Sequence, residues 1–198
     1  MKRNSGFTLL EVIGALIASS LLMLVLFALW QRGQTSVEQA HAAYHLREVN
    51  NATEIYVKRH YETLLHASSA SSGPRITIAQ LINDGALPED FRDTNLWGQS
   101  YEIYVRRPQE NVLNTIIITR GGREHEEGDS FATLTVPGAA MRFGGAGGFV
   151  PTGDITGQTP GTLLGSSGGY VLDLAVLGIA SPGPGHLGAY SAFDEYDL

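Results

Sequence analysis

The chain has 198 residues, of which 43% are hydrophobic and 17% charged, and this composition is typical of one folded domain or of a domain with an appendage. The formal net charge of -7 argues against a nucleic-acid-binding surface, because such surfaces collect lysine and arginine. The absence of cysteine excludes disulfides, thiolate metal ligands and a cysteine nucleophile.

The first thirty residues contain a long apolar run with one carboxylate at its start. No charged residue lies between Val12 and Trp30, and the run is close to the roughly 20 helical residues that cross a bilayer. Glu11 directly precedes it, and an unpaired carboxylate near the bilayer centre costs about 2 to 3 kcal/mol. The segment therefore predicts a membrane anchor in which Trp30 lies at the membrane face and Glu11 has a specific partner.

Two ordinary explanations account for only part of this segment. A cleaved secretory signal has an apolar stretch of roughly 7 to 15 residues, closely followed by an A-x-A cleavage site. Here the apolar run is longer, and the nearest such triplet, residues 40–42, lies well beyond Trp30. A plain signal anchor fits the length, but it gives no reason for Gly6 or Glu11.

The sequence GFTLLEV, residues 6–12, resembles the prepilin signature of type IV pilins and type II secretion pseudopilins. The resemblance implies that a prepilin peptidase cuts between Gly6 and Phe7 and methylates the new N-terminus at Phe7. It also implies that the subunits pack their apolar helices into a filament core. The partner of Glu11 would then be the α-amino group of Phe7 on a neighbouring subunit, because opposite charges neutralise each other in an apolar bundle.

A helical pattern continues after the apolar run. From Gln31 to about His66 there is no proline, and Gly33 is the one glycine. Apolar or small residues recur at the three- and four-residue spacing of one helix face: Ala42, Leu46, Val49, Thr53, Val57, Tyr61 and Leu64. The anchor helix is therefore predicted to continue with an amphipathic second half, which the serine-rich residues 68–73 end.

A short helix and a strand pair are predicted next. In TIAQLINDG, Thr77 and Gln80 have the spacing of a capping box, and Gly85 stands where a C-terminal cap belongs. QSYEIYV and NTIIIT read as two strands joined by a turn at residues 108–111. The first strand is expected to present one apolar face, made of Tyr101, Ile103 and Val105.

Glycine-rich connections dominate the sequence after Arg120, where most of the 24 glycines lie. FATLTV, residues 131–136, is compatible with a strand or a helix, and AAMRF, residues 139–143, is predicted to form one short helical turn closed by Gly144. GGYVLDLAVLG, residues 168–178, is predicted to be a strand.

A narrower resemblance covers almost the whole chain, from Gly6 to near Tyr190. The order GALPEDF, TNLWGQSYEIYVRRP, IIITRGG, GGAGGFVP and GGYVLDLAVLGIASPGPGHLGAY is similar to the constant N-terminal region of PilV-type shufflon minor pilins of conjugative thin pili. In plasmid-borne members, this region is followed by a recombination-switched segment that recognises the recipient cell. The present sequence runs only to FDEYDL, so we expect the switched segment to be absent or replaced by a short fixed tip.

No group of residues points to catalysis. His41 and His45 lie four residues apart with Glu38 one turn earlier, but no HExxH pattern surrounds them. The glycines of GGAGGF and GTLLGSSGG lack the spacing of phosphate-binding loops, and there is no GxSxG elbow. Trp97 is expected to pack at a strand entry. We therefore expect a protein that is not an enzyme, with no catalytic residue, metal site or cofactor.

The sequence thus predicts an α+β type IV pilin fold, in which a long N-terminal helix packs on an antiparallel β-sheet with Gly-rich loops. The expected domains are a cleaved prepilin leader at 1–6, a transmembrane and filament-core helix at 7–30, an amphipathic helix at 31–66 and a globular pilin head domain at 67–198. Many pilins close the C-terminal region with a disulfide. Here sheet pairing must do so, because cysteine is absent.

The resemblance implies a minor, tip-associated type IV pilin, a structural subunit of a pilus for cell-surface adhesion or recognition of a conjugative recipient. The expected partners are the major pilin, other minor pilins, the prepilin peptidase, the inner membrane before assembly and recipient-cell surface glycans, but not nucleic acid. The expected location is the bacterial inner membrane, with a single pass, and then the extracellular pilus. Two alternatives stay open: a type II secretion pseudopilin, and a signal-anchored periplasmic binding domain that keeps Met1.

Overall fold

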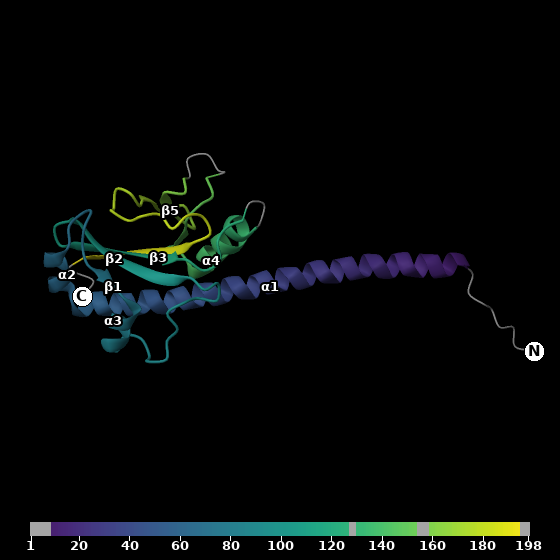
Figure 1. Cartoon of the computed structure of the whole chain (residues 1–198), viewed down its shortest axis with the longest axis horizontal. Helices are drawn as coiled ribbons and strands as arrows, with labels where there is room; N and C mark the ends of the chain where they lie inside the picture. The colour runs from purple at the N-terminus through teal and green to yellow at the C-terminus, as the bar shows by residue number, and fades with distance from the viewer. Residues whose placement is uncertain (1–8, 127–129, 154–158, 195–198) are drawn as a thin grey trace, which may run out of the picture. The chain divides into compact units, whose positions relative to one another are not determined.

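The computed structural model describes residues 9–126, 130–153 and 159–194 (Figure 1). The chain divides into two units, Met1–Val37 and Glu38–Leu198. The described part of the first unit is helical throughout, whereas the second, which we call the head unit, contains the rest of that helix and all the strands.

The longest element is α1, Leu9–Arg59, which is followed after His60 by α2, Tyr61–Ala67. The predicted helix from residue 31 to about 66 is therefore present, with a break at His60, whose φ of -113° and ψ of 17° are not helical. Asp84 accepts hydrogen bonds at this break from Arg59 Nη1 at 2.8 Å and from His60 Nε2 at 2.9 Å. The hydrogen bond from His60 is the main reason why the pKa of Asp84 lies below its ordinary value.

Seven strands form one sheet in the order β1-β2-β3-β7-β4-β5-β6. Every neighbouring pair in this sheet is antiparallel. The strands are β1 Arg75–Ile76, β2 Ser100–Gln109, β3 Val112–Arg120, β4 Gly147–Phe149, β5 Thr162–Gly165, β6 Val171–Asp173 and β7 Leu187–Asp194. Together with the long apolar helix, this sheet confirms the predicted α+β pilin architecture.

One face of the sheet packs against the part of α1 in the head unit. All seven helix positions predicted to share a face, from Ala42 to Leu64, are no more than 6% exposed. All of them except Thr53 share a hydrophobic core with alternate residues of the central strands: Tyr101, Ile103, Val105, Leu113, Ile117, Leu187, Ala189 and Phe193. The predicted helix face and the predicted face of β2 are both confirmed.

The opposite face of the sheet is also buried, which the sequence did not predict. Tyr104, Ile116 and Ile118 lie on this face, because they alternate with the residues that face α1. The Gly-rich C-terminal segment covers them with a second core, to which it contributes Val150, Leu163, Leu174 and Ile179. The β-branched run at residues 116–118 is therefore buried on both sides, as in the middle strand of a three-layer structure.

The short helix α3, Ile78–Asn83, begins and ends as its sequence predicts. Thr77 Oγ1 accepts from the Gln80 backbone N–H at 3.2 Å, and Gln80 Oε1 accepts from the Thr77 N–H at 2.8 Å, which is a complete capping box. Gly85 follows the helix with φ +71°, a conformation that glycine adopts without a steric penalty.

One local prediction needs correction, and two others are made more specific. β2 continues through Pro108 and Gln109, so the turn to β3 is limited to residues 110–111, where Asn111 has φ +59°. Residues 131–136 are helical: the π-helical turn η1, Phe131–Thr135, continues into α4, Val136–Phe143, which ends at Gly144. The helical turn expected at 139–143 is thus the second half of a longer helix.

The strand predicted at residues 168–178 is wrong for most of its length. β6 has three residues and stops at Asp173, whose side chain accepts from the backbone N–H of Ala175 at 2.9 Å and of Val176 at 3.3 Å. This turn ends the strand before the apolar residues 174–177, and Gly178 completes the reversal with φ +68°.

The second core predicts a measurable stability difference. Leu163→Ala removes a fully buried side chain of β5 and should lower the free energy of unfolding by roughly 2 to 5 kcal/mol. Val176→Ala, at a position 71% exposed in the same C-terminal segment, should change it by less than about 0.5 kcal/mol. Urea unfolding of the detergent-solubilised chain measures both, and equal effects would mean that the C-terminal segment is not part of the folded core.

Candidate assembly segment and head surface

The predicted assembly residues lie at the start of α1 and before it. Gly6 and Phe7 fall outside the described residues. Glu11 lies in the first turn of α1 and is exposed. A carboxylate is favoured in the first turn of a helix, because the unpaired N–H groups there carry partial positive charge.

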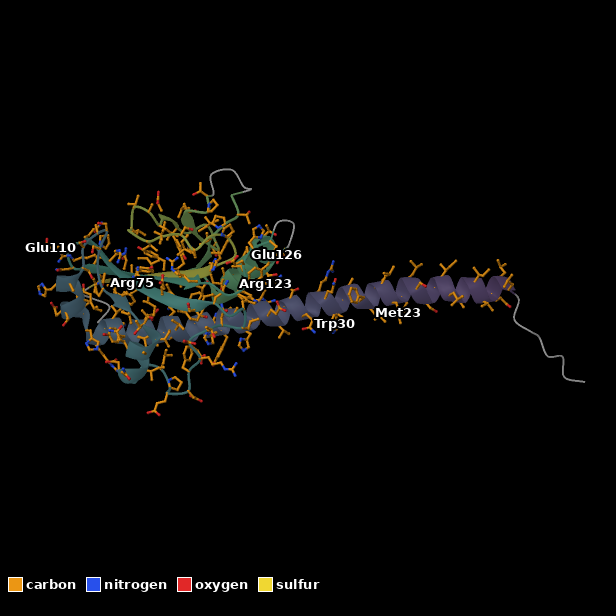
Figure 2. All side chains as sticks on the ribbon, viewed as in Figure 1. Met23, Trp30, Arg75, Glu110, Arg123 and Glu126 are labelled. Carbon is orange, nitrogen blue, oxygen red and sulfur yellow. The ribbon has the colours of Figure 1, made fainter. Side chains whose placement is uncertain are left out.

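The N-terminal part of α1 presents apolar side chains on all its sides. Every large apolar side chain from Leu9 to Trp30 is at least 45% exposed. Val12 is 45% and Trp30 60% exposed, and the rings of Phe27 and Trp30 lie 6.0 Å apart. Figure 2 shows Met23 and Trp30 on this surface. Such a surface is not that of an amphipathic helix on a soluble core, and it requires lipid or other apolar helices around it.

The polar groups in this stretch are satisfied within the helix. Ser19 Oγ donates to the carbonyl of Ala15 at 2.7 Å, and Ser20 Oγ donates to the carbonyl of Leu16 at 2.8 Å. Neither hydroxyl therefore needs water as a partner. In length and composition α1 can cross a membrane near the N-terminus, and it is the one described helix that can.

A charged and aromatic cluster lies on the side of the sheet that the C-terminal segment covers. Tyr104 Oη donates to Glu102 Oε2 at 2.6 Å, and Arg120 Nε donates to the same oxygen. Burial alone would raise the pKa of Glu102, but the hydrogen bonds from Tyr104 and Arg120 outweigh it, so that the pKa lies below its ordinary value. Burial, together with donation to Glu102, raises the pKa of Tyr104.

Two arginines connect this cluster to the C-terminal segment. Arg106 Nε donates to the carbonyl of Leu177 at 2.8 Å, and Arg120 Nη2 donates to the carbonyl of Ala180 at 2.5 Å. The guanidinium group of Arg106 also lies 5.4 Å from the centre of the Tyr104 ring. Residues 177–180 are thus held on the sheet by charged donors as well as by apolar contacts. One pattern in the sequence could have indicated this cluster, since Glu102, Tyr104 and Arg106 alternate along one strand.

The two histidines considered as a metal site have different environments in the structure. His41 is exposed, whereas His45 is 8% exposed and stacks on Phe91 with ring centroids 4.6 Å apart. His45 Nδ1 lies 2.9 Å from Tyr101 Oη, and burial lowers the pKa of His45. Among the described residues, no three His, Cys, Asp or Glu side chains come together as metal ligands. His45 is therefore a core histidine.

Trp97 is a packing residue, as predicted. It is 7% exposed, and its ring meets that of Phe131 edge-on with centroids 5.0 Å apart. The guanidinium group of Arg123 lies 4.3 Å from the centre of the Phe131 ring. Trp97 thus connects the entry of β2 to η1.

Comparison with known proteins identifies relatives over both halves of the chain. Residues 34–196 match the family described as bacterial shufflon protein, N-terminal constant region, and residues 1–27 match the prokaryotic N-terminal methylation motif. Shufflon proteins A', C' and B of Escherichia coli are each 28% identical over 200 residues, which is 98% of this chain. The alignments cover 43%, 42% and 41% of these relatives, so the chain spans about two-fifths of their length. No solved structure matches.

The cluster around Glu102 predicts a pH-dependent stability. Because the pKa of Glu102 is lowered on folding, its contribution is present above the ordinary glutamate pKa and is lost as the pH falls through the folded-state value. Glu102→Gln should lower the free energy of unfolding at pH 7 by about 1 to 2 kcal/mol, since charge-assisted hydrogen bonds are lost. The difference from the native chain should shrink below about pH 4.

The matched control is Glu110→Gln, which alters an exposed carboxylate in the turn between β2 and β3 (Figure 2). It should leave the pH dependence of unfolding as it is in the native chain. Unfolding curves between pH 3 and pH 7 compare the three proteins. A Glu102→Gln deficit that stays constant across this range would show that the ionised carboxylate is not what stabilises the cluster.

Proposed function

Since the chain belongs to the family of the N-terminal constant region of bacterial shufflon proteins and begins with a prokaryotic methylation motif, it is a type IV pilin-like subunit, and we propose that it is a minor, tip-associated pilin. In this role it is a structural subunit that supports adhesion to a cell surface or recognition of a conjugative recipient. The shufflon match favours a pilus over the pseudopilin filament of a secretion system.

The observation that carries the assembly role is the apolar surface of α1, which is exposed on every side between Leu9 and Trp30. In our proposal, residues 1–6 are a leader that the prepilin peptidase removes between Gly6 and Phe7. Methylated Phe7 is then the new N-terminus, and its α-amino group pairs with Glu11 of a neighbouring subunit. The pairing places two opposite charges together inside a bundle of apolar helices, which is far less costly than either charge alone.

The same surface supports a stage in the inner membrane before assembly. We propose that residues 7–30 cross the membrane once, with Val12 in the apolar span and Trp30 at the head-group level. Residues 31–66 would form the amphipathic helix, and residues 67–198 the domain displayed on the pilus. The partners in this scheme are the major pilin, other minor pilins and, at the recipient cell, surface glycans.

The tip position is supported by the direction of the head unit. Glu38 and Gln39 start its helix, and Gln39 Nε2 donates to the carbonyl of Leu134 at 3.4 Å at this end. β7 finishes at the other end, where Asp194 pairs with Val112 next to Asn111, whose carbonyl accepts from Tyr61 Oη at 2.6 Å. A ligand or a further segment held near Asp194 is therefore remote from the end at which the helix enters the head unit, as a tip subunit requires.

Glu11→Ala tests the central pair. The variant should enter the membrane at least as well as the native chain, because a charge is removed from an apolar segment. It should be incorporated into pili at least about tenfold less, since the α-amino group of a neighbour loses its counter-charge. Immunoblots of membranes and of sheared pili measure the two quantities separately.

The matched control is Glu62→Ala, which removes an exposed carboxylate of α2 and should be incorporated normally. Glu11→Asp keeps the charge and should retain part of the incorporation. Normal amounts of Glu11→Ala in sheared pili would exclude the pairing role of Glu11.

Gly6→Val tests the cleavage site. A β-branched side chain before the scissile bond should block the peptidase, so that the protein remains longer by its six leader residues and stays in the membrane. Intact-mass measurement of the membrane-extracted protein distinguishes the two forms. A processed protein with methylated Phe7 at native yield would show that the cut lies elsewhere.

A further inference from the structure

A pocket of about 550 Å³ lies in the head unit between α3 and the start of β2. Its lining comes from α3, from residues 91–94 of the connection that follows α3, and from Ser100 and Tyr101 of β2. The volume falls within the roughly 300 to 1,000 Å³ of small-molecule sites. None of the residues proposed for assembly lines this pocket, so it is separate from the apolar segment of α1.

The inner part of the pocket is aromatic and held in place. Phe91 is half-buried and Tyr101 is buried, and both contribute to the lining. His45 stacks on both rings, with its ring centroid 4.6 Å from that of Phe91 and 5.4 Å from that of Tyr101. His45 Nδ1 also lies 2.9 Å from Tyr101 Oη. These contacts fix the two aromatic rings that a ligand in the pocket would meet.

Three consecutive polar side chains line the same pocket: Arg92, Asp93 and Thr94. The first two are exposed and the third is half-buried. Within the parts of the chain that the structure describes, these three side chains form no hydrogen bond or ion pair. A guanidinium group, a carboxylate and a hydroxyl are therefore available to a ligand beside the aromatic rings.

The backbone that carries these side chains is fixed in advance. Thr94 forms an antiparallel bridge with Ser100. Asn95 Oδ1 accepts from the backbone N–H of Trp97 at 2.9 Å and from that of Gln99 at 3.0 Å. A ligand would therefore meet groups that already have their positions, which reduces the entropy lost on binding.

We propose that this pocket binds a neutral saccharide, whose ring lies against Phe91 and Tyr101 and whose hydroxyl groups bond to Arg92, Asp93 and Thr94. The inference deepens the proposed function, on which it rests for the source of the sugar, the surface of another cell. It places a recognition site in the head unit itself.

The chemistry of the lining selects this class of ligand. A sugar ring has C–H groups on its faces and hydroxyl groups around its edge, so it fits an aromatic surface with polar groups beside it. The Asp93 carboxylate can accept from two neighbouring hydroxyls, Arg92 can donate, and Thr94 can do both. Each hydrogen bond to a charged group is stronger than one between neutral groups.

Other classes of ligand fit less well. Arg92 and Asp93 carry opposite charges, so a simple anion or cation would be repelled by one of them. Among the described residues, no group of His, Cys, Asp or Glu side chains here could hold a metal ion. An apolar ligand would remove water from Arg92, Asp93 and Thr94 without replacing its hydrogen bonds.

Asp93→Ala tests the site in the full chain, solubilised in a detergent without a sugar head group. The probes are lactose, maltotriose and N,N′-diacetylchitobiose, and saturation-transfer NMR measures their binding. The native chain should bind at least one of them. Asp93→Ala should weaken this binding by about tenfold or more, because charge-assisted hydrogen bonds are lost. Its melting temperature should be native, since the Asp93 side chain has no partner in the described structure.

The matched control is Asp90→Ala, which removes an exposed carboxylate of the same connection that does not line the pocket. It should bind the sugar as the native chain does. Arg92→Ala should weaken binding as Asp93→Ala does, and two variants with native melting temperatures would exclude a folding defect. No binding of any of the three sugars, or binding that neither pocket variant weakens, would overturn the proposal.

Purified pili test the source of the sugar. Asp93→Ala should be incorporated normally, because the pocket is separate from the apolar segment of α1, but pili that carry it should adhere less to recipient cells. The free sugar should inhibit adhesion of native pili. Adhesion of Asp93→Ala pili at the native level would overturn the assignment to a cell surface. If the solubilised chain binds the sugar but is absent from pili, the proposed function fails while the site stands.

Discussion

The constraint on which the molecule depends is that α1 has two kinds of surface. From Leu9 to Trp30 its side chains are apolar on every side and exposed, so this part is stable only among lipids or other apolar helices. From Ala42 onward one side alone is apolar, and that side is buried against the sheet. A single helix therefore serves two environments, and the change between them coincides with the boundary between the two units at Val37.

The composition of the C-terminal third follows from the burial of both faces of the sheet. The face opposite α1 is covered by a segment with little regular structure, which must approach the strands closely. At Gly188 a Cβ atom would lie 2.6 Å from the carbonyl oxygen of Ile117 and 2.7 Å from Leu163 Cδ1, so only glycine fits. Arg106 and Arg120 donate to the backbone carbonyls of Leu177 and Ala180 and so hold the covering segment on the sheet. Many glycines of this segment are thus required because a side chain would prevent the close packing of the segment on the sheet.

Elements that depend on residues close together in the sequence could be predicted, whereas elements that depend on distant contacts could not. The capping box at Thr77 and the helix face from Ala42 to Leu64 were readable, because each depends on residues a few positions apart. The strand predicted at 168–178 is wrong because the Asp173 side chain makes a turn within it, which the apolar run does not indicate. β7 was not predicted because its mixture of small, aromatic and polar residues has no regular alternation. Its place between β3 and β4 depends on contacts between residues far apart in the sequence. For the assembly residues, Glu11 and its neighbours, the sequence motif remains the main source of information.

The position of β7 also sets the order in which the molecule can form. β7 is the last described strand, yet it lies between β3 and β4 and contributes Leu187, Ala189 and Phe193 to the main core. The head unit is therefore incomplete until the chain has been made to Asp194, whereas the apolar helix is the first part to be made. Such non-local pairing is slow compared with local contacts, and it leaves the edge of β3 exposed in the meantime.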